Sequence, residues 1–458
     1  LFRSYQLSNF ALLMKAREKD RRLFRRDYSI NLFDVPRSRY DIENYQNIID
    51  SSSNIDKDKT RSDLKSILDV FKYGDDLGSI ININKDIDIS GLKKLIGSDN
   101  DEGQIDLLSD TVKEELESIL NVVEVLNNKY DVSVTNPPYM GGGKMDVPLK
   151  KYVQKNYPDS KADLFSVFME KLVSTTKDDG YIGMVTMHSW MFLSNFEKLR
   201  KKLQKHTIIN MAHLGTRAFE EIGGEVVQTT TFILQERKND GYVGSYERLV
   251  DYGSQDGKEE KYLEIVDGKD IQDLYQVSQD NFYKIPGSPI AYWASKNIIR
   301  DFENGTSLGK IVNAKQGLAT ANNNRFLRQW FEVNINRIGF HCNNIEESVE
   351  SRKKWFPYNK GGAYRKWYGN YDYVVNWQND GYEIRHFVDS RGKIRSRPQN
   401  TDFYFKPAVT WSLITSSLFS MRYRLPGSIH DVSGMSLFYK DQDLKIIMGL
   451  LNTKVGQY

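Results

Sequence analysis

The alternation of strand and helix patterns between residues 130 and 236 constrains the fold of this chain more than any other feature. β-branched and aromatic residues cluster in short runs, and apolar residues recur at helical spacing between these runs. Strands that alternate with helices favour a doubly wound α/β sheet, here with an added C-terminal strand pair. The expected elements are strands over 130–135, 181–187, 207–214 and 226–236, and helices over 162–177 and 196–205.

A four-residue motif, Asn136-Pro137-Pro138-Tyr139, follows the first of these strands directly. Ligand sites of open α/β sheets lie at the carboxyl ends of strands. The two prolines fix the backbone and remove two N–H donors, which leaves carbonyl groups available as acceptors. The Asn136 side-chain oxygen and the Pro137 carbonyl suit the two hydrogens of an exocyclic amino group, and Tyr139 offers a face for its ring. Such a site localises the lone pair of the nitrogen for attack on a methyl group, and it needs no metal or general base. The alternative is a turn without function.

The motif and its surroundings resemble the amino-group DNA methyltransferases that use S-adenosylmethionine, in the form typical of the adenine-N6 branch. Residues 162–172, 179–185 and 189–200 are similar to later segments of that family. The resemblance implies a Rossmann-like methyltransferase fold, incomplete at its N-terminus, with Asn136–Tyr139 as catalytic residues. It also implies that Phe196 stacks on the extruded base opposite Tyr139; the alternative for Phe196 is a buried helix residue.

The expected cofactor-binding residues come from the same resemblance. Residues 6–17 resemble the helix after the family's acidic ribose-binding strand, and residues 31–34 would end the next strand. Phe33, Asp34 and Asn136 would then lie near the cofactor. The sequence contains no family-type Gly-rich cofactor loop and no preceding acidic strand end. We expect both upstream of Leu1, so that this piece of a longer protein lacks most of the cofactor pocket.

The C-terminal half suggests a DNA substrate. Residues 351–400 contain 11 Lys/Arg against 4 Asp/Glu, with eleven interleaved aromatic residues, which suits a polyanion with flat rings. The alternative is a solvated basic face over an aromatic β core. Residues 315–327 and 355–362 look like target-recognition regions of large single-chain restriction–modification enzymes, and the whole pattern most resembles the methyltransferases of BREX phage-defence systems, the PglX type. The candidate DNA-binding residues are Asn324, Arg325, Lys360, Arg365 and Lys366.

These observations predict an order of domains along the chain. Residues 1–237 would form the C-terminal part of the catalytic domain, and residues 41–128 an acidic surface insertion within it. Between Asp41 and Asp110 there are 16 Asp/Glu against 8 Lys/Arg. Residues 238–307 would connect to an incomplete α+β target-recognition domain over 308–458.

Several other kinds of site are not supported by the sequence. The six histidines have no metal-ligand spacing, and the single cysteine, Cys342, excludes an internal disulfide. Gly141-Gly142-Gly143-Lys144 lacks the Ser/Thr of a phosphate-binding loop, and we interpret it as a loop beside the active site that reaches DNA. No apolar run approaches the ~18 residues of a membrane span. We expect a cytoplasmic protein without a metal.

The predicted function is therefore site-specific methylation of adenine N6 in double-stranded DNA, within restriction–modification or phage defence and alongside other defence proteins. Three alternatives remain open at this point. The chain could be a DNA-recognition module with vestigial catalysis, it could methylate cytosine N4, or it could act on protein glutamine or RNA guanine. The basic aromatic segment counts against the last two substrates, whose known enzymes are compact.

Overall fold

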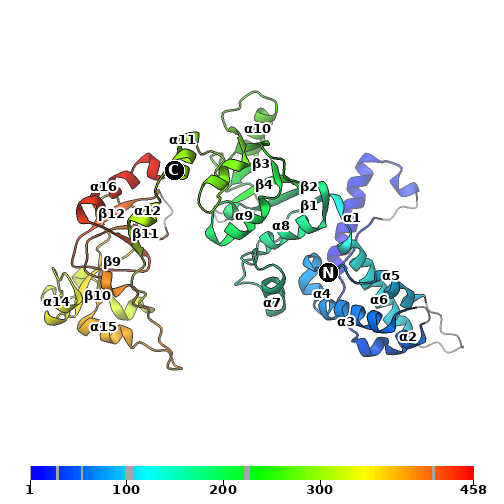
Figure 1. Ribbon diagram of the computed structural model, residues 1–458, viewed down its shortest axis with the longest axis horizontal. Helices are drawn as coiled ribbons and strands as arrows, with labels where there is room; N and C mark the ends of the chain where they lie inside the picture. The colour runs from blue at the N-terminus through cyan, green and yellow to red at the C-terminus, as the bar shows by residue number, and fades with distance from the viewer. Residues whose placement is uncertain are drawn as a thin grey trace. The chain divides into compact units, whose positions relative to one another are not determined.

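The computed structural model describes residues 2–26, 30–52, 55–97, 107–220, 227–414 and 418–457. It divides into two compact units, Leu1–Glu303 and Asn304–Tyr458 (Figure 1). Within the described ranges, no helix combines the length and apolar character that a membrane crossing needs.

The first unit is built on a six-stranded mixed sheet with the order β1-β2-β4-β3-β5-β6. The predicted strands and helices between residues 130 and 236 are confirmed. The sheet is not wholly parallel, however, because β4 inserts antiparallel between β2 and β3. Residues 243–278, expected in a connecting region, supply the last two strands of this sheet. The strands are β1 (Tyr130–Thr135), β2 (Thr176–Met187), β3 (Thr207–Gly215), β4 (Thr229–Gln235), β5 (Val243–Arg248) and β6 (Leu274–Ser278).

Period-two alternation gives this sheet two different faces. On one face, Ile182, Met184 and Phe232 are buried against α8 (Leu164–Thr175) and α9 (Glu197–Leu203). The opposite face carries exposed apolar side chains where no described helix covers it, such as Val134, which is 74% exposed. Toward β3 and β5 this second face is covered by α10 (Gln255–Val266), which lies on the other side of the sheet from α9 (Figure 1).

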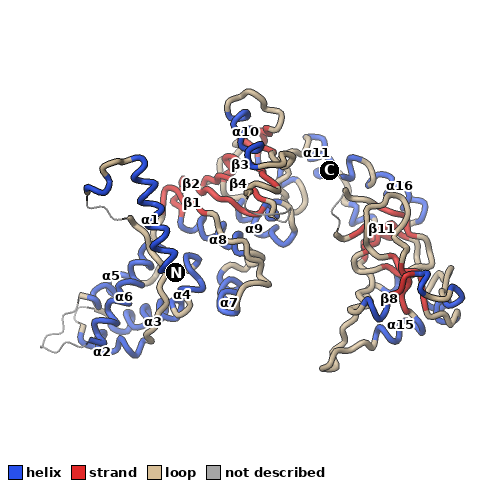
Figure 2. Tube along the Cα trace, turned by 180° about the vertical axis from the view of Figure 1, so that it is seen from behind, coloured by secondary structure: helices blue, strands red, loops and turns tan. Residues whose placement is uncertain are grey.

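The acidic insertion is a helical subdomain (Figure 2). Its predicted last helix is confirmed as α6, and its core continues into α7 and α8. Three hydrogen bonds make this junction, of which the first two are buried. The Tyr157 hydroxyl donates to the Ile80 carbonyl at 2.6 Å, the Lys171 ammonium to the Ile81 carbonyl at 2.6 Å, and the Asn82 N–H to the Tyr152 hydroxyl at 2.7 Å. The insertion is thus part of the support for the sheet. Its helices and the one that follows are α2 (Gln46–Ser51), α3 (Lys57–Phe71), α4 (Gly74–Leu77), α5 (Ile89–Ile96), α6 (Leu107–Asn127) and α7 (Val147–Asn156).

The structure at the start of the chain agrees only in part with the elements predicted from the sequence. The opening helical pattern forms α1 (Phe2–Lys19). The prediction of a strand that ends at Asp34 is wrong, because residues 30–41 have no regular secondary structure. A four-residue segment forms a strand only where a neighbouring strand supplies hydrogen bonds, and no described strand pairs with this segment.

The second unit contains two four-stranded sheets, in the orders β13-β9-β10-β8 and β12-β11-β14-β7. Short strands with helices at their margins agree with the expected α+β character. The strands are β7 (Asn313–Lys315), β8 (Leu327–Gln329), β9 (Trp355–Asn359), β10 (Tyr373–Asn376), β11 (Ala408–Ser412), β12 (Met421–Arg424), β13 (Ile429–His430) and β14 (Gly434–Phe438). The helices from the end of the first unit onward are α11 (Lys296–Asn304), α12 (Leu308–Ile311), α13 (Asn323–Phe326), α14 (Ile345–Glu350), α15 (Gln378–Arg385), α16 (Asp441–Leu451) and α17 (Lys454–Gln457).

Candidate active site at the carboxyl end of β1

The Asn136–Tyr139 motif lies where the sequence places it, immediately beyond the carboxyl end of β1. β1 pairs in parallel with β2 up to Thr135, opposite Met184, so the motif stands at the same sheet edge as the end of β2. Asn136 and Pro138 are exposed, Pro137 is buried and Tyr139 is half-buried. The Asn136 side chain is therefore open to a substrate, while Pro137 fixes the turn.

Asp163 holds the backbone that follows the motif. Its carboxylate accepts hydrogen bonds from the Met140 N–H at 2.9 Å and from the Phe165 N–H at 3.4 Å, which caps the N-terminus of α8. The Leu164 N–H donates to the Met140 carbonyl at 3.0 Å, and Gly141 forms an isolated bridge with Asp163. Burial raises the pKa of Asp163, and the N–H groups that it accepts from oppose this rise.

The hydrogen bonds by which Asp163 holds this loop were not predicted from the sequence. The signal was present, because an Asp directly before an apolar helical run is a typical N-cap. The second role of Asp163, as acceptor for Met140, depends on a contact across 23 residues. Asp163 therefore joins the first turn of α8 to the loop that carries Asn136.

The predicted stacking pair is not assembled in this structure. Phe165 contacts both rings: its centroid lies 6.2 Å from that of Tyr139, edge-on, and 5.5 Å from that of Phe196. Phe196 is only 3% exposed and belongs to the core between the sheet, α8 and α9. It fits the alternative of a buried phenylalanine, because its apolar ring fills space beside Phe165. Burial raises the pKa of Tyr139, whose hydroxyl has no hydrogen-bond partner among the described residues.

Two histidines, His213 buried and His188 half-buried, form a hydrogen-bonded chain at this same sheet edge. His188, the first residue after β2, lies in a 3-10 turn (His188–Met191), and its Nδ1 is 2.8 Å from Nε2 of His213 on β3. Nδ1 of His213 is 2.9 Å from the Tyr292 hydroxyl. Burial lowers the pKa of His213 to about 3, with a further contribution from His188, and burial also lowers the pKa of His188. Both rings are therefore neutral near pH 7, and the pair positions the ends of β2 and β3. The sequence could not reveal it, because the inserted β4 separates these strands.

A cavity of about 610 Å³ lies beside the glycine-rich loop that follows the motif. Gly142 and Gly143 line it together with Lys150, Lys161 and Lys198. Only Lys198 of these lysines forms a described ion pair, with Asp159 at 3.8 Å. The cavity is therefore basic.

Phe33 and Asp34, the other two expected cofactor-binding residues, are not brought to this edge by any described contact. Both are exposed in the irregular segment over 30–41. Among the described residues, no hydrogen bond, ion pair or ring contact joins either of them to the Asn136–Tyr139 loop. The assignment of Phe33, Asp34 and Asn136 to the cofactor stays a prediction.

In the second unit, two of the candidate DNA-binding residues share one hollow. Lys360 and Arg365 line a cavity of about 330 Å³, together with the backbone of Gly361. A Cβ on Gly361 would lie 2.4 Å from the Ser433 carbonyl, so only glycine allows this close approach. The Lys360 ammonium lies 5.1 Å from the centre of the Tyr373 ring.

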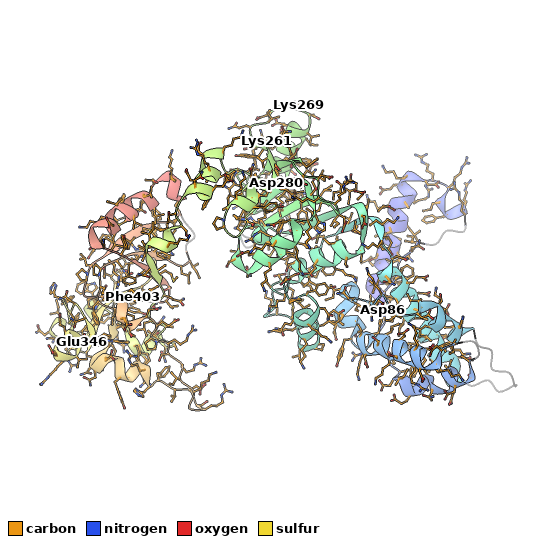
Figure 3. The ribbon with its side chains drawn as sticks, viewed as in Figure 1. Asp86, Lys261, Lys269, Asp280, Glu346 and Phe403 are labelled. Atoms are coloured by element: carbon orange, nitrogen blue, oxygen red, sulfur yellow. The ribbon has the colours of Figure 1, made fainter. Side chains whose placement is uncertain are left out.

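The other candidates are more restricted. Arg325 is paired with Glu383 at 2.8 Å, and the Lys366 ammonium donates to the Asn452 carbonyl at 3.0 Å. Asn324 is exposed on α13. A further basic and aromatic group was missed: the Lys315 and Lys406 ammonium groups lie 5.4 and 5.5 Å from the centre of the Phe403 ring, which Figure 3 labels.

Comparisons with known proteins found similar sequences and structures. Residues 2–219 match the model of the Eco57I restriction-modification methylase family. The chain is 45% identical, over 457 residues, to the adenine-specific methyltransferase PglX of Lacticaseibacillus casei (strain Zhang), which covers 98% of this chain and 37% of that protein. It is 36% identical, over 485 residues, to the adenine-specific methyltransferase BrxX of Escherichia coli O9:H4 (strain HS), covering 100% of this chain and 38% of that protein.

Among solved structures, the Type IIL restriction-modification enzyme MmeI in complex with DNA is similar over 87% of this chain and 56% of that chain, with 12% identity and a TM-score of 0.46. The chain spans 37% and 38% of the lengths of PglX and BrxX. The family resemblance predicted from the sequence is confirmed: residues 2–219 match the Eco57I methylase family, and over nearly its whole length the chain is a relative of the PglX- and BrxX-type adenine-specific methyltransferases.

Proposed function

We propose that the protein to which this chain belongs methylates adenine N6 in double-stranded DNA, in restriction–modification or phage defence and together with other defence proteins. The observation that carries the proposal is the Asn136–Tyr139 motif at the carboxyl end of β1, with an exposed Asn136 and a backbone held by Asp163. The names of the relatives, adenine-specific methyltransferases, support the same reaction.

The chain's own residues would act on the amino group. The Asn136 side-chain oxygen and the Pro137 carbonyl accept the two N6 hydrogens, which draws the nitrogen out of conjugation with its ring. The methyl group would come from S-adenosylmethionine, which supplies it as an electrophile. The N6 lone pair would form the new bond to the methyl carbon as the methyl–sulfur bond breaks, S-adenosylhomocysteine would leave with the electron pair of that bond, and one N6 proton would pass to solvent. Catalysis then rests on position and hydrogen bonding.

The described residues supply the acceptor side of this reaction rather than a complete cofactor site. Asn136 stands at the sheet edge, whereas Phe33 and Asp34 have no described contact with it. β1 pairs on one side only within the described chain.

DNA would contact two basic surfaces. The cavity beside the motif carries Lys150 and Lys161, which suit the phosphates next to an extruded base. In the second unit, Lys360 and Arg365 suit phosphates or base edges. Tyr139 is the aromatic ring near Asn136 that is open enough to stack on the base, and we propose that Phe196 supports the site from the core.

A transfer assay with three classes of acceptor tests this proposal. The full-length protein would be incubated with labelled S-adenosylmethionine and with duplex DNA, a release factor or ribosomal RNA. Asn136→Ala is the test variant. Asn128→Ala is its control, because Asn128 is an exposed asparagine just before the opposite end of β1. We expect label in DNA, lost with Asn136→Ala and kept with Asn128→Ala.

Two results would decide between the alternatives. Sequence-selective DNA binding without any transfer would favour a recognition module. Label in the protein or the RNA, and none in DNA, would contradict the proposal.

A further inference from the structure

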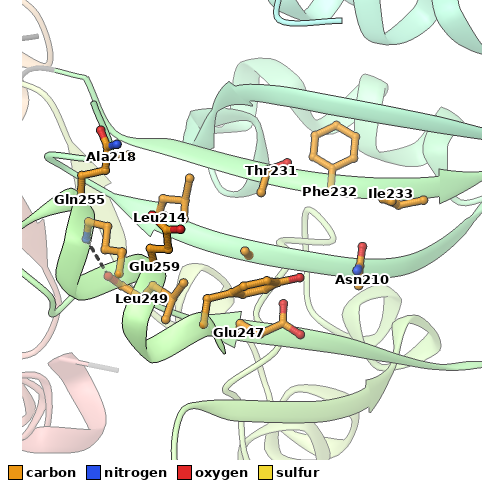
Figure 4. A pocket seen from close by; sticks show the side chains of 13 residues that line it. Asn210, Leu214, Ala218, Thr231, Phe232, Ile233, Glu247, Leu249, Gln255 and Glu259 are labelled. Carbon is orange, nitrogen blue, oxygen red and sulfur yellow. Dashed lines mark hydrogen bonds between the residues drawn. The ribbon is translucent and has the colours of Figure 1, made fainter. Parts of the chain in front are cut away.

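A second cavity lies on the sheet face opposite α8 and α9, under α10 (Figure 4). The strand register creates its floor, because Ala212 of β3 pairs with Thr231 of β4 on one side and with Glu247 of β5 on the other. These three side chains stand in one row across three adjacent strands. Tyr262 of α10 is among the residues that close the cavity, which measures about 330 Å³. This volume is in the range of small-molecule sites.

Glu247 is the feature of this cavity that requires an explanation. It is only 6% exposed, and its Oε2 has no hydrogen-bond partner among the described residues. Burial raises the pKa of Glu247 to about 7. The lysine in the cavity wall does not neutralise it, because the Lys258 ammonium donates to the Leu249 carbonyl at 2.7 Å and to the Tyr252 carbonyl at 2.5 Å.

A buried carboxylate without a partner is costly, and a bound cation removes that cost. The remaining walls suit a cation with an apolar body, since Leu214, Ile233 and Leu249 line the cavity and Tyr262 offers an aromatic ring. The titratable groups that face the site besides Glu247 are Lys258, Glu259 and Tyr262, of which Glu259 is exposed. Both carboxylates attract a cation, and only Glu247 is in the interior.

We propose that this cavity binds a small organic cation, whose ammonium or amidinium group meets Oε2 of Glu247 and whose apolar body packs between the β3–β5 face and α10. The site is separate from the Asn136–Tyr139 loop, and it does not depend on the proposed methylation.

Calorimetric titration of the full protein at pH 8 tests this site, with benzamidinium as the probe and benzamide as its neutral counterpart of similar shape. We expect benzamidinium to bind more tightly than benzamide. Glu247→Gln should weaken benzamidinium by about tenfold or more and leave benzamide unchanged, because it removes the charge and keeps the shape. Glu259→Gln is the matched control, because it removes the exposed carboxylate of the cavity in the same way. It should weaken benzamidinium binding much less than Glu247→Gln does.

A second variant covers the case in which Glu247→Gln does not fold. Ala212→Leu fills the cavity from its floor and leaves the carboxylate in place, so it should abolish binding of benzamidinium. The proposal is overturned if benzamidinium shows no saturable binding, if benzamide binds equally well, or if binding survives Glu247→Gln or Ala212→Leu unchanged.

Discussion

Replacement of Asp163 by alanine tests whether the loop after the motif is held in the way described. The change removes the cap of α8, which is worth about 1 kcal/mol, and the bond from the Met140 N–H to a carboxylate, which is worth roughly 1.5–3 kcal/mol. Because burial raises the pKa of Asp163, part of this gain is offset by desolvation. We therefore expect a loss of about 2–3 kcal/mol in the free energy of unfolding.

Asp146 provides the matched control for this experiment. It caps α7 through one hydrogen bond, from the Leu149 N–H at 2.9 Å, and has no described bond to the motif loop. Asp146→Ala should therefore cost only about 1 kcal/mol. Asp163→Asn keeps a neutral acceptor and should fall between the two alanine variants.

Urea unfolding and hydrogen exchange at the Met140 amide measure the two effects of Asp163→Ala separately. The account predicts faster exchange at Met140 and reduced methyl transfer, since Asn136 lies four residues before Met140 in the same loop. The reasoning is refuted if Asp163→Ala costs no more than Asp146→Ala and leaves the exchange of Met140 and the transfer unchanged.

The remaining predictions concern pH, DNA and the junction with the insertion. As pH falls from 7 to 5, the unfolded state takes up a proton at His213 that the folded state does not, which lowers the free energy of unfolding by about 2 kcal/mol. Over the same range the folded state takes up a proton at Glu247, which raises the free energy of unfolding by about 2 kcal/mol. Urea unfolding of Glu247→Gln at pH 5 and 7 should therefore show a steeper loss on acidification than the wild type; equal slopes would contradict the assignment. Arg365→Ala should weaken DNA binding and lower its salt dependence by about one ion, measured by fluorescence anisotropy, and Arg325→Ala should do so less because Arg325 is paired with Glu383; equal effects would count against this distinction. Lys171→Met leaves the Ile81 carbonyl without its donor and should lower the free energy of unfolding by about 1–3 kcal/mol, measured by urea unfolding. An unchanged free energy of unfolding would show that this hydrogen bond does not stabilise the junction.

Local patterns were sufficient to predict the centre of the fold. Residues 130–236 alternate between periods of two and 3.6, and this alternation gave the strands, the helices and the position of Asn136 beyond β1. Pairing order is not local, so the antiparallel insertion of β4 and the meeting of His188 with His213 could not be predicted.

The surroundings of Arg325, Phe196 and Asp34 depend on pairing between distant segments, which local sequence patterns do not show. Arg325 is basic and near aromatic residues, but it forms an ion pair with Glu383, which lies 58 positions later in the chain. Phe196 has the right residue type for stacking, but packing against Phe165 buries it. Asp34 lies in a segment that no described strand supports.

The central claim is that the Asn136–Tyr139 loop holds an adenine amino group for methylation. Its most direct test is mass analysis of the nucleosides from duplex DNA, after incubation of the full-length protein with S-adenosylmethionine that carries a deuterated methyl group. The account predicts labelled N6-methyladenine with the wild type and none with Asn136→Ala, while Asn128→Ala keeps the yield. Labelled N4-methylcytosine in its place, or the same yield of N6-methyladenine from Asn136→Ala, would contradict it.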